Sequence, residues 1–188
     1  LVAAAVAGQG HEAAAVQARD AVPNRIFDQG LEDQCRHHRL QHLVLVESGG
    51  AMRQLTEGPH RDRQGAFSPD GAWIAFQTDR WPGKLALIRP DGSGLSEVLP
   101  GRTTSVFNPF WSPDGRWLAS GNTDADGPFL LEIADGRPAG APGFLAPVGD
   151  ADLDFWPSSF SPDGRRIAGA LYSAAANPVG GAVYSLEE

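Results

Sequence analysis

The sequence has very few of the residues that build disulfides, thiolate metal sites or membrane spans. It holds one cysteine, Cys35, in 188 residues, and a single thiol can form neither an internal disulfide nor a four-thiolate zinc site. No run of about eighteen apolar residues occurs, which excludes a membrane-spanning helix. Basic residues are outnumbered, with 15 Lys and Arg against 23 Asp and Glu and a net charge of −8. Because phosphate binding needs a basic surface, we do not expect nucleic acid as a partner.

Turn-forming residues, by contrast, are abundant. The chain contains 23 glycines and 15 prolines beside 41% hydrophobic and 20% charged residues. This composition is typical of a globular protein, because disordered chains carry more charge and less apolar surface. The glycines and prolines predict many short elements joined by tight turns.

One five-residue motif occurs three times: an aromatic residue followed by Ser-Pro-Asp-Gly. Asp114 lies 44 residues after Asp70, and Asp163 lies 49 residues after Asp114. Each copy fits a type I turn, in which Ser holds the backbone, Pro presets φ and Gly takes a positive φ. An aspartate that recurs at one turn position in every unit is structural, so we assign it no catalytic role. The predicted turn residues are Ser68, Pro69, Asp70, Gly71, Ser112, Pro113, Asp114, Gly115, Ser161, Pro162, Asp163 and Gly164.

Apolar residues flank each turn at constant offsets. The aromatic residue stands directly before the serine, and an aliphatic residue followed by alanine stands four residues after the aspartate. The aromatic positions are Phe67, Trp111 and Phe160, and the aliphatic positions are Ile74, Leu118 and Ile167. This pattern predicts a β-hairpin around each turn, with both sets of positions buried.

A second apolar segment is phased with the motif and completes a repeating unit. It occupies residues 43–46, 85–88 and 129–131, and short fourth strands are expected at 52–56 and 95–99. Each unit therefore holds about four short strands in roughly 44 residues, which is typical of a β-propeller blade. We predict an all-β propeller with about two complete four-stranded blades and partial blades at both ends.

The residues after the first copy of the motif extend it into a longer pattern. An aliphatic-Ala pair follows the turn, then the stretch Thr78-Asp79-Arg80, then a turn at Asp91-Gly92. Over about residues 43–186 this pattern resembles the blade repeat of the TolB family, which also occurs in propeller domains of prolyl-oligopeptidase-like and tricorn-like peptidases. The resemblance implies a non-catalytic propeller that binds a protein or peptide partner in the bacterial envelope, and it favours a periplasmic or extracellular location. The resemblance identifies the blade but not the function, because a fold does not fix a function.

Two other functions are compatible with such a repeat. The chain could be the accessory propeller of a prolyl-oligopeptidase-like serine peptidase, but it contains no Gly-x-Ser-x-Gly nucleophile motif, so that catalytic domain would lie outside it. A propeller lyase or glycan-binding protein is the third hypothesis. We predict no catalytic residue and no cofactor-binding residue within the chain.

Residues 1–42 lack the motif and are rich in Ala, Gln, His and Arg. Residues 12–19 favour a helix by propensity, and Pro23 would end it. A leader, a divergent blade and a helical extension all fit, so we assign 1–42 as an atypical N-terminal segment and 43–188 as the blades. At the other end, residues 182–186 resemble the third strand of a blade without its fourth. Because an open ring leaves strand edges unpaired, we expect self-association or further blades from a longer chain.

Two groups of candidate metal ligands stand outside the repeat. Asp150, Asp152 and Asp154 alternate, so an extended strand would point all three carboxylates to one side, as calcium binding requires. A solvated acidic loop is the alternative. The second group would line one face of a helix as zinc ligands, if that helix forms. Its members are Glu32, Cys35, His38 and His42.

Trp81 is the aromatic residue best placed to contact a partner. It lies beside Pro82 and Gly83 in a loop between two predicted strands, and exposed tryptophans are enriched where proteins bind one another. Packing in the core or within the loop is the alternative.

Overall fold

The computed structural model describes residues 4–6, 15–20, 41–82, 84–100, 102, 106–122, 127–148 and 153–186, the first two ranges as backbone only. All regular secondary structure in these ranges is β, and the strands pair antiparallel within four sheets. No helix in these ranges is long and apolar enough to cross a membrane. The prediction of an all-β fold is confirmed.

The four sheets follow one another in the sequence. The first contains β1 (Ala4–Val6), β2 (Ala15–Asp20), β3 (Gln41–Val46) and β4 (Met52–Gln54). The second contains β5 (Asp62–Phe67), β6 (Ile74–Thr78), β7 (Leu85–Ile88) and β8 (Ser96–Glu97). The third contains β9 (Val106–Trp111), β10 (Trp117–Asn122), β11 (Phe129–Ala134), β12 (Arg137–Pro138) and β13 (Gly143–Phe144). The fourth contains β14 (Leu153–Phe160), β15 (Arg166–Ser173) and β16 (Pro178–Ser185).

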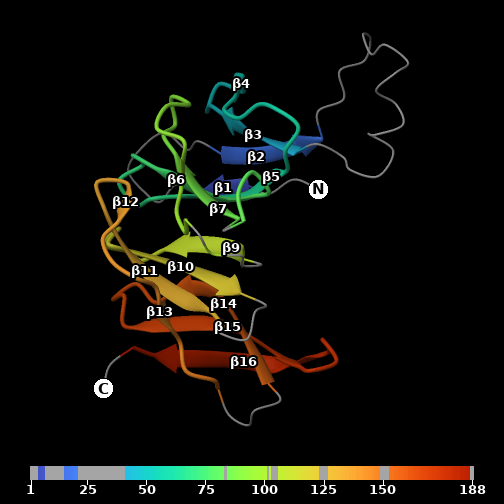
Figure 1. Cartoon of the computed structure of the whole chain (residues 1–188), viewed down its shortest axis with the longest axis vertical. Helices are drawn as coiled ribbons and strands as arrows, with labels where there is room; N and C mark the ends of the chain where they lie inside the picture. Colours follow the sequence, from blue (N-terminus) through green and yellow to red (C-terminus); the bar gives the residue numbers. More distant parts are fainter. Residues whose placement is uncertain are drawn as a thin grey trace.

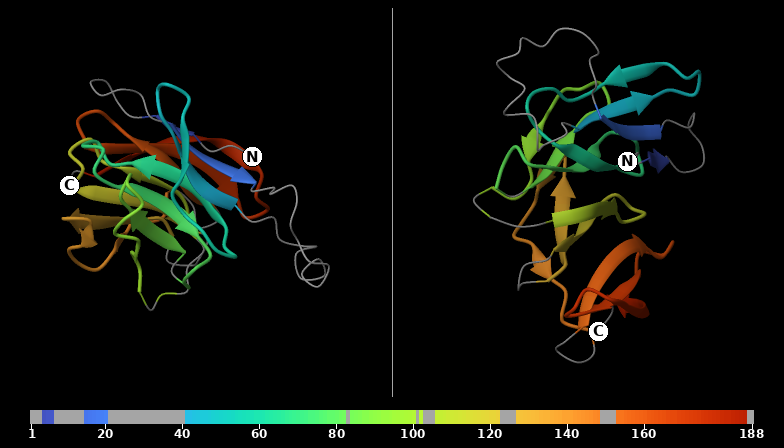
Figure 2. Two further views of the ribbon diagram at one scale, coloured as in Figure 1. Left: turned by 90° about the horizontal axis from the view of Figure 1, so that it is seen from above. Right: turned by 90° about the vertical axis from the view of Figure 1, so that its right-hand side faces the viewer.

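The first two sheets lie side by side at one end of the long axis of the molecule, and the third and fourth follow in sequence order toward the other end (Figure 1). The right-hand view of Figure 2 shows the same succession, from the N-terminal sheet to the C-terminal one. Strand β9 contacts both β5 and β14, so the first strands of the last three sheets are neighbours. We call β5, β9 and β14 the inner strands. Antiparallel sheets that succeed one another and meet through their first strands are the blades that the repeat predicts.

Each Ser-Pro-Asp-Gly segment closes a hairpin between the first two strands of its sheet. In the first copy, Ser68 N–H donates to the Trp73 carbonyl and Gly71 N–H donates to the Ser68 carbonyl, both at 2.8 Å. The Ser68 hydroxyl also accepts from Trp73 N–H at 2.9 Å. The same bonds occur around Ser112 and Ser161. Gly71 has φ of +70°, a conformation that glycine adopts without the steric cost of a side chain.

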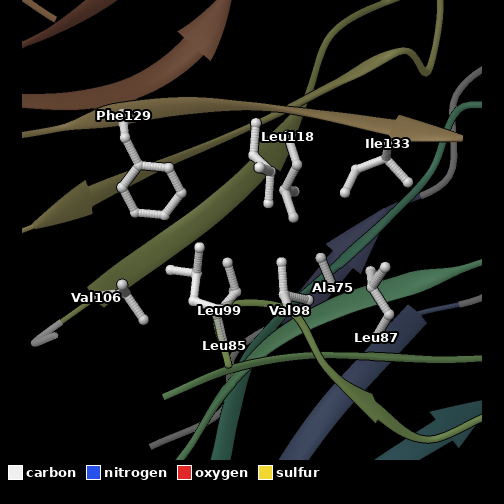
Figure 3. Packing of buried hydrophobic residues seen from close by; sticks show 10 residues of the cluster. Ala75, Leu85, Leu87, Val98, Leu99, Val106, Leu118, Phe129 and Ile133 are labelled. Carbon is white, nitrogen blue, oxygen red and sulfur yellow. The ribbon is translucent and has the colours of Figure 1, made fainter. Parts of the chain in front are cut away.

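The core lies between the sheets. The aliphatic residues after the three turns, Ile74, Leu118 and Ile167, have no exposed surface. Figure 3 shows Leu118, Phe129 and Ile133 of the third sheet pointing toward residues of the second, among them Leu85, Leu87, Val98 and Leu99. Because each sheet covers the apolar face of the next, no single sheet forms a complete core alone.

The aromatic residues before the turns are less buried than predicted. Phe67, Trp111 and Phe160 are half-buried and pack against the edges of three separate clusters. Trp111 shows the reason, because its indole Nε1–H donates to the Ala66 carbonyl of the neighbouring sheet at 3.1 Å. The tryptophan thus lies at the junction of two sheets, with its polar atom paired and part of its ring accessible.

The helix expected at residues 12–19 is wrong over residues 15–20, which form strand β2. Strand β2 pairs with β1 on one side and β3 on the other, with Val16 opposite Leu45 and Gln17 opposite Val44. Alanine-rich segments favour helices in isolation, but pairing with a neighbouring strand overrides that weak preference. The first sheet therefore has four strands, where the sequence predicted only its second half.

Candidate functional site

The inner strands share a bulge at one position of the repeat. Gln64 and Asn108 stand six residues before their motif aspartates, and they have positive φ values of 55° and 51°. The strand pairing shifts register between Arg63 and Ala66 in β5, and at the matching places in β9 and β14. A bulge redirects side chains, so this one controls where the residues beside it point.

Amide side chains at the bulges link successive sheets. The Gln64 Oε1 atom accepts a hydrogen bond from Asn108 N–H at 2.9 Å. The Asn108 Nδ2 group in turn lies 3.4 Å from the Pro157 carbonyl, at the equivalent position of β14. These contacts tie the three inner strands together at one level.

One residue before each bulge, the inner strands carry a cation and two aromatic rings. We call Arg63, Phe107 and Trp156 the inner-strand row, because each stands seven residues before its motif aspartate. The Phe107 and Trp156 rings are 4.7 Å apart between centroids, and the Tyr172 ring of β15 lies 4.2 Å from that of Trp156, with both pairs tilted. Arg63 is exposed, while the three aromatic residues are half-buried. The row therefore offers a cation beside partly accessible aromatic surface.

A cavity of about 390 Å³ lies at the Arg63 end of this row, between the second and third sheets. It is at the start of β5 and β9, and so at the opposite end of these strands from the Ser-Pro-Asp-Gly turns. Three basic side chains and one carboxylate line it. The lining residues are Arg61, Arg63, Gln77, Thr78, Asp79, Lys84, Val106 and Phe107.

The carboxylate in the cavity is already engaged by the protein. Asp79 Oδ1 accepts a hydrogen bond from Arg61 N–H at 2.9 Å and lies 3.4 Å from His60 Nδ1. The basic side chains outnumber this carboxylate, in a chain whose net charge is −8. The cavity is thus a locally basic place on an acidic protein, which favours an anionic ligand.

A buried ion pair supports the wall of the cavity. Asp62 has no exposed surface, and its Oδ2 atom lies 2.6 Å from Arg80 Nη2. The Thr78 hydroxyl donates to Asp62 Oδ1 at 2.6 Å. These contacts fix the end of β6 to the start of β5.

The motif aspartates lie at the far end of the strands from the cavity. Hydrogen bonds from the Ser68, Ser112 and Ser161 hydroxyls, and then from backbone N–H groups, lower the pKa values of Asp70, Asp114 and Asp163. Each charge is used to hold its own turn. The twelve predicted turn residues all lie at this end, away from the basic cavity.

The remaining predicted site residues are not brought together. Trp81 is half-buried and packs against the cluster that contains Leu43 and Phe76, so its role in partner binding stays a prediction. Asp154 is exposed on β14, and Asp150 and Asp152 lie outside the described residues. No group of three His, Cys, Asp or Glu side chains in the described ranges could hold a metal ion. The calcium hypothesis therefore also stays a prediction.

Of the four candidate zinc ligands, only His42 lies within the described residues. It is 6% exposed on β3, and burial lowers the pKa of its imidazole. Its Nδ1 atom makes no hydrogen bond among the described residues. Glu32, Cys35 and His38 lie outside those residues.

Sequence reasoning did not find the inner-strand row. The motif is recognised because its positions keep one residue type in all three copies. The inner-strand row does not, since it holds arginine, phenylalanine and tryptophan at one offset. Its only signal was that offset, counted back from each motif aspartate.

Comparison with known proteins supports the fold. No protein-family profile and no curated protein sequence matches this chain, but many solved structures do. TolB from Acinetobacter baumannii superposes with a TM-score of 0.55 at 12% identity, over 97% of this chain and 44% of that one. A protein of Agrobacterium tumefaciens assigned to TolB gives 0.56 at 18% identity, over 86% and 51%. The chain has the β-propeller fold.

An enzyme with the same architecture superposes equally well. Oligogalacturonate lyase from Vibrio parahaemolyticus gives a TM-score of 0.57 at 14% identity, over 94% of this chain and 52% of that one. The chain therefore spans about half the length of these propellers. At such low identities the likeness shows the propeller fold alone.

Proposed function

We propose that this propeller is a non-catalytic binding module that holds an acidic segment of a protein or peptide partner in the basic cavity. One observation carries the proposal. The cavity between the second and third sheets gathers Arg61, Arg63 and Lys84 beside the Phe107 ring, in a chain that is acidic as a whole.

The chemistry of the cavity suits binding better than bond cleavage. The hydroxyl of Thr78 is buried and donates to Asp62, so its proton is already committed. The carboxylate of Asp79 accepts a hydrogen bond from Arg61 N–H. The cavity also carries positive charge and an aromatic face, which recognise carboxylates and the apolar side chains between them.

The shape of the site suits an extended segment. The inner-strand row continues from Arg63 through Phe107 and Trp156, with the Tyr172 ring packed against Trp156. A peptide with acidic and aromatic residues could place its carboxylates near the basic end and its rings along the row. The resemblance to TolB supports such a partner in the bacterial periplasm or outside the cell.

Fluorescence anisotropy tests the proposal. A fluorescein-labelled peptide of alternating aspartate and phenylalanine should bind the full chain, and a peptide with lysine in place of aspartate should not. Arg63→Glu should weaken binding by about tenfold, because a repulsive charge replaces an attractive one. Arg166→Glu, which changes an exposed arginine of β15 outside the cavity, is the matched control.

Salt dependence separates charge recognition from nonspecific association. Since exposed charges are screened beyond about 8 Å at physiological ionic strength, affinity should fall as salt rises. Equal binding of the aspartate and lysine peptides, or equal loss in the two arginine variants, would refute the basic cavity as the site. Binding of oligogalacturonate in place of the peptide would favour the glycan hypothesis.

A further inference from the structure

A second cavity lies on the outer side of the second and third sheets, away from the inner strands. Its volume is about 670 Å³, within the range of about 300–1,000 Å³ that holds small ligands or a few side chains. It is lined by Ser96, Glu97, Val98, Leu99, Pro100, Arg102, Leu131, Arg137, Pro138, Gly140 and Pro142. We call it the outer groove, and it shares no lining residue with the basic cavity.

The floor of the outer groove is apolar and rigid. Val98, Leu99 and Leu131 are at most 4% exposed, and all three belong to the core cluster between the two sheets. Figure 3 shows Val98 and Leu99 within that cluster, opposite side chains of the third sheet. A floor made of well-packed core residues keeps its shape, so a ligand would not have to order it.

The walls of the groove are the outermost strands of their sheets. β8 ends the second sheet and β12 ends one side of the third, and each is only two residues long. No other strand covers them in the described part of the chain. Strand edges beside an apolar floor are suited to an extended peptide, which can bond to backbone and insert alternate side chains.

The rim of the groove carries arginine on both sides. Arg137 is exposed, and its guanidinium has no carboxylate partner among the described residues. Arg102, on the opposite wall, stacks over the Phe144 ring at 5.1 Å. Glu97 also lines the groove, so the two arginines leave one net positive charge at the border of the apolar floor. That charge complements a segment whose apolar side chains are followed by carboxylates.

From this complementarity we infer that the outer groove binds a second peptide ligand: an extended segment with two apolar side chains followed by acidic residues. The apolar side chains lie against the exposed rings of Pro100 and Pro138, above the buried Val98, Leu99 and Leu131. The carboxylates pair with Arg137. This site is independent of the basic cavity, so either one can fail without the other.

A glycine in the groove allows a direct test. A Cβ atom added at Gly140 would meet nothing within 4 Å, and its φ is not positive. Gly140→Trp should therefore fold normally and fill the groove with an indole ring. Gly49→Trp is the matched control, since Gly49 is equally open and lies in a turn outside the groove.

The probe is a fluorescein-labelled decapeptide in which two leucines, separated by one residue, are followed by two aspartates. The full chain is titrated into it, and binding is followed by fluorescence anisotropy. We expect saturable binding, an affinity loss of about tenfold or more in Gly140→Trp, and no change in Gly49→Trp. Arg137→Glu should weaken binding by several fold without filling the groove, which keeps the test valid if the tryptophan variant misfolds. Arg63→Glu should leave this affinity unchanged.

Three results would overturn the inference. One is the absence of saturable binding by the unmodified chain. The second is an equal affinity of the Gly140→Trp and Gly49→Trp variants, with folding of both verified by circular dichroism. The third is equal binding of a peptide with lysines in place of the aspartates, since the rim charge would then select nothing.

Discussion

Asp62 carries its negative charge at a position with no exposed surface, and one arginine compensates it. The Arg80 side chain is itself only 13% exposed and contacts both carboxylate oxygens. Burying two charges is expensive, so such a pair is weak evidence of net stabilisation. Removing only one partner lowers the free energy of unfolding, because the other charge is then buried without compensation.

Arg80→Met tests this at the scale of the residue. The substitution keeps an apolar chain of similar length but leaves the Asp62 carboxylate unpaired, so we expect a loss of about 3–5 kcal/mol in the free energy of unfolding. Urea denaturation followed by tryptophan fluorescence measures it. Arg166→Met, on the exposed face of β15, should change stability by less than about 0.5 kcal/mol. Similar denaturation midpoints for both variants would mean that the pair carries no structural role.

At the scale of the element, the three Ser-Pro-Asp-Gly turns act as one repeated device. In each, the serine hydroxyl bonds to the aspartate at the second position after it and accepts from the N–H of the fifth. The ionised carboxylate is the better acceptor, which is why the aspartate pKa values lie below the ordinary value of 3.8. Because the pKa is lower in the folded state, the stability that each turn contributes depends on pH.

The sign of that linkage is fixed by the direction of the pKa shift. The stabilisation is present above the unfolded-state pKa of about 3.8 and is lost as pH falls through the lower folded-state pKa. We expect the thermal midpoint to fall as the pH is lowered below about 4, and to fall less steeply in the triple variant Asp70→Asn, Asp114→Asn, Asp163→Asn. Calorimetry between pH 7 and pH 3 measures both slopes. Asp154→Asn, whose carboxylate accepts no hydrogen bond among the described residues, should keep the original slope.

The hairpins were predictable from sequence because their determinants are local. Each turn contains its own serine, proline, aspartate and glycine, and the buried aliphatic residue follows at a fixed offset, as at Ile74 and Leu118. The burial of Trp111 was overestimated for a physical reason. The repeat places it at the junction of two sheets, and its distance from solvent depends on the neighbouring blade rather than on its own strand.

Features that depend on distant residues escaped prediction. Strand β2 exists because it pairs with β3, from Asp20 opposite Gln41 to Ala15 opposite Val46, and its alanines alone favour helix. Asn108 holds a positive φ with its N–H bonded to Gln64, 44 residues away. The basic cavity depends on the same long-range placement, because Lys84 and Arg63 meet only once three strands have paired and the next sheet is packed against them.

At the scale of the whole molecule, each sheet depends on its neighbour to cover one face. The cluster between the second and third sheets draws residues from both, and the fourth sheet packs its own cluster against Phe110 and Leu130 of the third. Such a stack is stabilised by nearest-neighbour contacts. Among the described strands, none covers the second face of the fourth sheet or the free edge of β16.

The open edge of β16 should make the isolated chain self-associate. The fourth sheet has three strands in the described residues, where the other sheets have four or five, and Val179 and Val183 of β16 are 59% and 67% exposed. An eight-residue strand with an unpaired edge and exposed valines is a template for pairing with another copy.

Light scattering on the 188-residue chain should show a mean mass that rises with concentration. The Val183→Lys substitution should lower this mass, because charge on a strand edge opposes pairing. Ala175→Lys, in the exposed turn between β15 and β16, is the control and should leave the association unchanged. A monomeric mass at every concentration would show that the edge is already protected, and a response equal in both variants would place the contact elsewhere.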